Sequence, residues 1–202
     1  MSEIAHAAGH GEVTVDPDFG TASDGKVGMW IFLLTDAMSF SGFLLGYGIL
    51  RGEAHDWPNP AERLGIPSTA VMTFALICSS VSMVLALEAA KQRNRQKTIQ
   101  WLALTICGGL FFLLGQVREY TNLIHEGHVF SQDHFMSTFY SVTGFHGLHV
   151  FTGVTYLTVI FIRTLRGHYT NGDYNHIEIC GLFWHFVDLV WILVFTFVYL
   201  IQ

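Results

Sequence analysis

The stretch ICGLFWHFVDLVWILVFTFVYLI, Ile179 to Ile201, carries a single charged residue, Asp188, in 23 positions. A helix of about 20 apolar residues is long enough to cross the hydrocarbon core of a bilayer. Transmembrane barrel strands are about half as long and alternate polar with apolar side chains, which this stretch does not do. The stretch therefore predicts a membrane-spanning helix, and it indicates the fold class for the rest of the chain.

Four further apolar runs precede it, separated by short charged or turn-rich segments. We expect membrane spans at about 27–50, 68–90, 98–124, 135–162 and 177–201, which together form one transmembrane domain over 27–202. Residues 1–26 are acidic and predict a poorly ordered N-terminal tail. Charged side chains make up 13% of the chain, against about 25% in soluble domains. The predicted fold is all-α, an integral membrane bundle of five transmembrane helices, and the net charge of −6 argues against nucleic-acid binding.

Basic residues predict the orientation of these helices, because loops rich in Lys and Arg stay in the cytoplasm. With the N-terminus inside and the C-terminus outside, seven of the ten basic residues face the cytoplasm. These seven are Lys26, Lys91, Arg93, Arg95, Lys97, Arg163 and Arg166. Only Arg51, Arg63 and Arg118 then lie at the outer end.

Several polar side chains lie inside the predicted spans, where charged groups are rare and mark functional sites by default. Asp36, His146 and Asp188 each fall roughly 14–17 Å along their helices, near the middle of a core about 30 Å thick. His146 and His149 are three residues apart on one helix face, as are His185 and Asp188. These groups suggest a proton relay, a metal or haem site, or an interhelical hydrogen-bond network that fixes packing. A di-iron bundle is disfavoured, because it would use Glu-x-x-His motifs.

Two groups near the helix ends are further candidates. Glu119, next to Arg118, suggests an interfacial ion pair, at either a solvated helix tip or a contact with a partner subunit. Arg163, Arg166 and His168 cluster after the fourth span, and basic pockets on the cytoplasmic side bind anionic lipid headgroups.

Longer motifs carry a family resemblance. TGFHGLHVFTG (Thr143–Gly153) and FWHFVDLVWILVF (Phe183–Phe195) resemble two hallmark segments of subunit III of haem–copper oxidases. GQVREY (Gly115–Tyr120), SSVSM (Ser79–Met83) and GMWIFLLTDAMSF (Gly28–Phe40) also fit, in the right order. The resemblance covers nearly everything from Lys26 to the C-terminus and matches the short, five-helix form of the family.

The resemblance implies a non-catalytic accessory subunit of a proton-pumping oxygen reductase in the bacterial cytoplasmic membrane. Such a subunit binds no haem or copper itself; these lie in partner subunits, and it packs beside the catalytic subunit I, in a complex with subunit II. It binds phospholipid, here through Arg163 and His168, and it supports proton uptake and durable turnover. We expect His146 and His149 to hydrogen-bond within the bundle, as part of a structural polar network. This network would also include residues that match family positions: Glu119, Glu178, Trp184, His185 and Asp188.

One departure concerns the electron donor. Cytochrome c oxidases of the family usually have Ser-Glu where this chain has Thr35-Asp36, and Asp there resembles the quinol oxidase branch. GFHGLHV and QVREY resemble the cytochrome c oxidase branch instead. Two readings from other classes stay open on the residues alone: a stand-alone proton-coupled transporter and a His-liganded membrane cytochrome. The first predicts substrate flux by the chain alone, and the second predicts a bound metal or a haem spectrum.

Overall fold

A computed structural model describes residues 23–169 and 174–201. Its helices are α1 (Asp24–Glu53), the short α2 (Pro60–Arg63), α3 (Ile66–Lys91), α4 (Arg95–His125), α5 (His134–Leu165), α6 (Asn175–Val194) and the π-helix η1 (Phe195–Leu200). Five helical stretches are long and apolar enough to cross a membrane, with α6 and η1 counted as one. The predicted all-α bundle of five transmembrane helices is therefore confirmed. Most of the predicted acidic tail lies outside the described residues, and α1 begins at Asp24.

Local sequence explains where the helices begin and end. Asn94 and Asp133 are N-caps, whose side chains accept hydrogen bonds from the backbone N–H groups of the first turns of α4 and α5. Gly127 and Gly167 follow α4 and α5 with φ of 87° and 83°, a left-handed conformation that glycine adopts without strain. These signals keep the connections short and place successive helices antiparallel.

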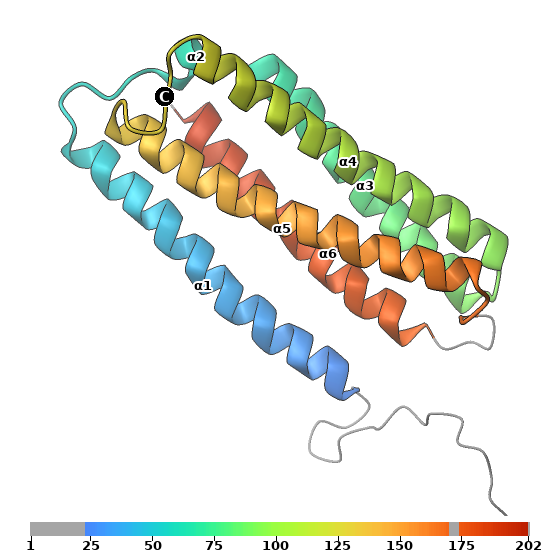
Figure 1. Cartoon of the computed structure of the whole chain (residues 1–202). Coiled ribbons are helices and arrows are strands. Elements are labelled where there is room, and N and C mark those ends of the chain that lie inside the picture. The colour runs from blue at the N-terminus through green and yellow to red at the C-terminus, as the bar shows by residue number, and fades with distance from the viewer. Residues whose placement is uncertain (1–22, 170–173, 202) are drawn as a thin grey trace, which may run out of the picture.

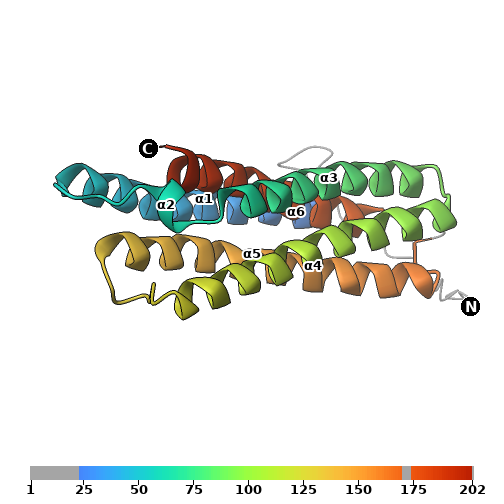
Figure 2. The same cartoon turned by 90° about the horizontal axis from the view of Figure 1, so that it is seen from above.

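The helices form two layers. Figure 2 shows α4 and α5 in one layer, with α3, α6 and α1 in the other. Helix α6 packs on α3, α5 and α1. Helix α1 packs mainly on α5 and α6 among the long helices described here, and it lies at one edge of the bundle (Figure 1). In the most apolar part of each helix, 61% of the α6 residues are buried but only 17% of those in α1. Thus α6 is the central helix, and α1 is the peripheral one.

Candidate functional site

The most distinctive polar contact of the interior joins α1 to α5. Asp36 on α1 is 7% exposed, and its Oδ1 lies 3.2 Å from Nε2 of His149 on α5. The other ring nitrogen of His149, Nδ1, lies 2.8 Å from the carbonyl oxygen of Phe145, one turn earlier. The sequence predicts that both residues lie inside membrane spans, but it does not predict that they contact each other.

The hydrogen bonds of His149 limit where its protons are. A carbonyl oxygen only accepts, so Nδ1 must donate its hydrogen to Phe145. The contact between Nε2 and Asp36 then needs one more proton, held either by the imidazole or by the carboxyl group. In both arrangements the two residues together are electrically neutral, which the low dielectric of a bundle interior favours. The pair can therefore hold one proton, or pass it between two atoms, without a change in net charge.

The surroundings of this pair are mostly aromatic. The Phe40 and Phe145 rings lie edge-on to His149, with centroids 5.1 and 4.6 Å away. On its open side His149 lines a pocket of about 390 Å³ between α1, α5 and α6. The other lining residues are Met29, Phe32, Leu148, Thr152, Tyr156 and Phe183. Oδ2 of Asp36 is buried without a hydrogen-bond partner in the described part of the chain.

His146 differs from expectation. It is fully buried, but neither ring nitrogen has a hydrogen-bond partner among the described residues, so the expected hydrogen bond within the bundle is wrong for this residue. Its contacts are aromatic instead: the ring stacks on Trp191 with centroids 4.8 Å apart and meets Phe112 edge-on at 5.6 Å. His146 therefore fills space between α4, α5 and α6 rather than joining His149.

A row of hydroxyl groups on α3 connects it to α6. Trp184 Nε1 donates to Ser79 at 3.2 Å, and Trp191 Nε1 donates to Thr73 at 2.8 Å. Beside them, the Ser80 hydroxyl lies 2.6 Å from Nδ1 of His185. Two of the predicted network residues, Trp184 and His185, thus bond to the same helix.

Close packing accompanies this row of hydroxyls. Trp184 lies against Gly109 and Gly153, where a Cβ atom would come within 2.6 and 2.9 Å of the indole. Asp188 is buried one turn after His185, and its Oδ1 has no hydrogen-bond partner in the described structure.

Glu119 is buried rather than solvated. It is 9% exposed, Thr69 and Tyr199 supply its hydrogen bonds, and its carboxylate forms no ion pair with Arg118 in the described residues. The sequence-based expectations of an ion pair and of a solvated helix tip are thus both wrong. The π-helical turn η1 brings Tyr199 here, a feature that the apolar run of the last span does not reveal.

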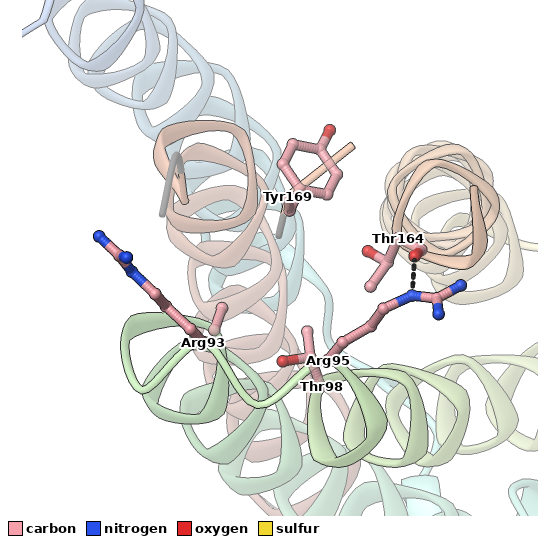
Figure 3. A pocket seen from close by; sticks show the side chains of 6 residues that line it. Arg93, Arg95, Thr98, Thr164 and Tyr169 are labelled. Atoms are coloured by element: carbon pink, nitrogen blue, oxygen red, sulfur yellow. Dashed lines mark hydrogen bonds between the residues drawn. The ribbon is translucent and has the colours of Figure 1, made fainter. Parts of the chain in front are cut away.

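At the opposite end of the bundle, a salt bridge joins Glu178 to Lys26 at 2.8 Å and ties the start of α6 to the start of α1. The predicted lipid contacts Arg163, Arg166 and His168 are all exposed, at and just after the end of α5. Arg95, one of the seven basic residues that predict the orientation, also makes a contact between helices. In the structure its Nε donates to the Thr164 carbonyl at 3.0 Å, across from α4 to α5 (Figure 3).

This contact of Arg95 places a cation at the carbonyl end of α5, where the helix dipole favours it. The cavity beside it, lined by Arg93, Thr98 and Tyr169 among others, is only about 10 Å³. For metals, no three His, Cys, Asp or Glu side chains of the described residues are arranged as ligands. That this chain binds no haem or copper stays a prediction.

Comparisons with known proteins match the sequence of this chain to one family. The family model for cytochrome c oxidase subunit III matches residues 10–202. Cytochrome c oxidase subunit 3 of Alkalihalophilus pseudofirmus is 34% identical over 175 residues, which cover 86% of this chain and 85% of the relative. The probable cytochrome c oxidase subunit 3 of Mycobacterium tuberculosis is also 34% identical, with 88% of each chain covered.

A relative with a different name matches nearly as well. Cytochrome bo(3) ubiquinol oxidase subunit 3 of Pseudomonas aeruginosa is 33% identical over 198 residues, 97% of this chain and 92% of the relative. The region that the family model matches, residues 10–202, includes all five transmembrane helices and the residues described above. The chain therefore belongs to the cytochrome c oxidase subunit III family, the subunit III of haem–copper oxidases.

Proposed function

We propose that the chain works as a non-catalytic accessory subunit of a proton-pumping oxygen reductase. In this role it packs beside the catalytic subunit I, which holds the haems and the copper, together with subunit II. The observation that carries the proposal is the neutral Asp36–His149 pair between α1 and α5. An accessory subunit that influences proton uptake needs a group able to hold a proton near mid-membrane, and this pair supplies one without a metal or a haem.

Orientation and location complete this proposal. The N-terminus faces the cytoplasm and the C-terminus faces outward, in a bacterial cytoplasmic membrane, as the seven basic residues at one end favour. Under this orientation the Lys26–Glu178 salt bridge lies at the cytoplasmic surface and Glu119 at the outer one.

Bound phospholipid is the second part of the role. Arg163, Arg166 and His168 are exposed at the cytoplasmic end of α5, and Arg95 reaches the same helix end. Cationic clusters at this level attract anionic headgroups. A phosphate is expected near Arg163 or His168 in a high-resolution map of the complex. A map in which another subunit's side chains fill that surface would contradict this part of the proposal.

The electron donor has two candidates, and in both it reacts with partner subunits rather than with this chain. Cytochrome c is favoured by the names of the relatives from Alkalihalophilus pseudofirmus and Mycobacterium tuberculosis. A quinol is favoured by the name of the Pseudomonas aeruginosa relative and by Asp36, which resembles the quinol oxidase branch. Oxygen consumption by the purified complex with each reduced donor separates the two.

The test of the main proposal is purification of the tagged chain in mild detergent. The expected result is a complex of larger partners with a visible haem spectrum, and no stoichiometric iron or copper in this subunit after separation. Iron or copper that stays with the separated chain and disappears in His149→Ala would contradict the proposal. Substrate flux by the chain alone in vesicles would favour a transporter instead.

A further inference from the structure

A cleft at the outer end of the bundle lies apart from the Asp36–His149 pair. It opens between α3 and α4 beneath the short helix α2, with a volume of about 720 Å³. Glu119 lines it within the last two turns of α4, and Arg118 lies next to it. The proposed function does not use this cleft.

The Glu119 carboxylate is poorly satisfied for a buried charged group. Tyr199 donates to Oε2 at 3.3 Å, longer than the usual 2.5–3.0 Å of an O–H···O bond. The Thr69 hydroxyl lies 3.2 Å from Oε1 but also 3.1 Å from the Gly65 carbonyl. A hydroxyl has one hydrogen, so Thr69 can serve only one of these acceptors at a time. A carboxylate offers about four acceptor positions, and here at least two are without a donor.

The positive charges near this carboxylate do not compensate it. Arg63 lines the cleft, but its guanidinium is bound to Asp133. Arg118 is exposed and forms no ion pair within the described residues. The cleft therefore presents a buried anion that lacks donors beside an exposed cation that lacks a counter-ion.

The deeper wall of the cleft is apolar, whereas its other polar lining residues, Glu62, Ser68, Asn122 and Glu126, lie near the helix ends. Val71 on α3 and Phe111 and Leu114 on α4 line its deeper part and are 59%, 48% and 70% exposed. The cleft thus changes along its length from apolar walls at membrane depth to charged groups at the helix ends. This order of apolar surface, cation and anion is complementary to a zwitterionic phospholipid, in which the acyl chains are followed by the anionic phosphate and then by the cationic ammonium.

We infer that this cleft binds the headgroup of a phospholipid that carries a primary ammonium. The ammonium donates hydrogen bonds to Glu119, the phosphate lies against Arg118, and an acyl chain lies along Val71, Phe111 and Leu114. The three N–H donors of a primary ammonium supply what the Glu119 carboxylate lacks. A lysine of a neighbouring protein would supply the ammonium but would leave Arg118 without an anion.

The chemistry of the headgroup gives a direct test. Phosphatidylcholine has the same charges as phosphatidylethanolamine, but its trimethylated nitrogen has no N–H to donate. The purified complex is stripped of lipid in detergent and incubated with either lipid, with identical acyl chains. Mass spectrometry then counts the molecules retained per complex. We expect roughly tenfold tighter binding of phosphatidylethanolamine at one site, because hydrogen bonds to charged groups are strong.

Variants assign this preference to residues. Glu119→Gln should remove the roughly tenfold preference between the two lipids while phosphatidylcholine binding stays unchanged. Arg118→Gln should weaken both lipids, because both carry the phosphate. Glu88→Gln is the matched control: the same substitution on an exposed residue of α3, at the opposite end of the bundle.

Three results would overturn the inference: equal retention of the two lipids by the wild-type complex, an intact preference in Glu119→Gln, or a map with a partner's basic side chain at Glu119. If Glu119→Gln fails to assemble, the wild-type comparison of the two lipids decides alone. The same comparison can be made on the chain without partners, so a failed lipid site is separable from a failed assignment as an oxidase subunit.

Discussion

The central helix α6 and the peripheral helix α1 are held in the bundle by different chemistry. Trp184 and Trp191 of α6 are both buried, and each donates from a neutral indole to a neutral hydroxyl on α3. By contrast, α1 is held by Asp36 against His149 and by Lys26 against Glu178, groups that can carry charge. Most of the remaining surface of α1 is exposed.

Because of this difference, the contacts that hold the bundle together are not the contacts that hold a proton. Neutral donors and acceptors keep the same hydrogen bonds over a wide pH range, so the two tryptophan contacts of α6 with α3 form a frame that does not depend on protonation. The polar contact of α1 with α5 depends on one shared proton, beside the ring contact of Phe40 with Phe145. The residues able to hold that proton therefore lie at the edge of the bundle, where the movement of one helix disturbs few other contacts.

The largest effect is expected at the centre of this frame. Trp191→Ala removes the donor to Thr73 and the ring stacked on His146. A buried Trp replaced by Ala costs roughly 3–5 kcal/mol, so thermal unfolding in detergent should begin at a much lower temperature. Trp30→Ala is the control, because Trp30 on α1 is 61% exposed. Equal losses in both variants would mean that α6 is not the central helix of the folded protein.

Glycines provide a second test of the same contrast. A Cβ at Gly109 would lie 2.6 Å from the Trp184 ring, a rigid neighbour, so Gly109→Ala must displace α4 or α6. Overpacking of this kind costs roughly 1–3 kcal/mol. Gly42→Ala on α1 meets nothing within 4 Å and should unfold at the wild-type temperature or slightly above it. If the Gly109→Ala protein were as stable as Gly42→Ala, the Trp184 ring of α6 would be packed against Gly109 more loosely than the structure indicates.

The sequence alone predicts the fold well, for a physical reason. Long apolar runs such as Ile179–Ile201 are required by the bilayer thickness itself, so span number and type follow from run length. Helix pairing has no comparable local signal. The depth of Asp36 could be read from its position, but its contact with His149 depends on how α1 packs on α5.

The same limit applies to the other site residues. His146 has the residue type of a ligand or hydrogen-bonding group, but its aromatic neighbours come from α4 and α6, far away in sequence. Glu119 lies close to the end of its helix, a position that predicts a solvated or ion-paired side chain. It is buried because η1 places Tyr199 over it. Position along a helix is predictable from sequence, whereas burial by a distant element is not.

A third prediction concerns the proton shared by Asp36 and His149 at the edge of the bundle. Asp36→Asn can still donate an amide N–H to His149 Nε2, so α1 should stay in place and the initial rate of oxygen consumption should be nearly unchanged. The amide cannot hold or release the shared proton, and we expect activity to decay faster over sustained turnover. The measurement compares the initial rate with its decay over many turnovers in the purified complex.

Two further variants sharpen this prediction. Asp36→Leu leaves His149 Nε2 without a donor and should also lower the thermal stability of α1 packing. Thr35→Val is the control, because Thr35 is exposed and bonds to the backbone of its own helix. An immediate, near-complete loss of rate in an assembled Asp36→Asn complex would place Asp36 on an obligatory proton path and contradict our interpretation.

The smallest effect is expected outside the membrane, where α2 is tied to the start of α5. Partial burial alone would raise the pKa of Asp133, but hydrogen bonds from the Met136 N–H and from Arg63, together with the Arg63 charge, outweigh it and hold the pKa below its ordinary value of 3.8. A carboxyl group whose pKa is lowered by folding stabilises the folded state above its unfolded pKa, and this contribution disappears as the pH falls through the folded pKa. Asp133→Asn keeps the N-cap but loses the ion pair, which for a partly exposed pair is worth about 0.2–1 kcal/mol. The variant should therefore unfold slightly earlier than wild type at pH 7, and the two should converge below about pH 4. Unfolding temperatures measured from pH 7 down to pH 3 check this, and a difference that persists or grows in acid would show that Asp133 acts through its cap on α5 and not through its charge.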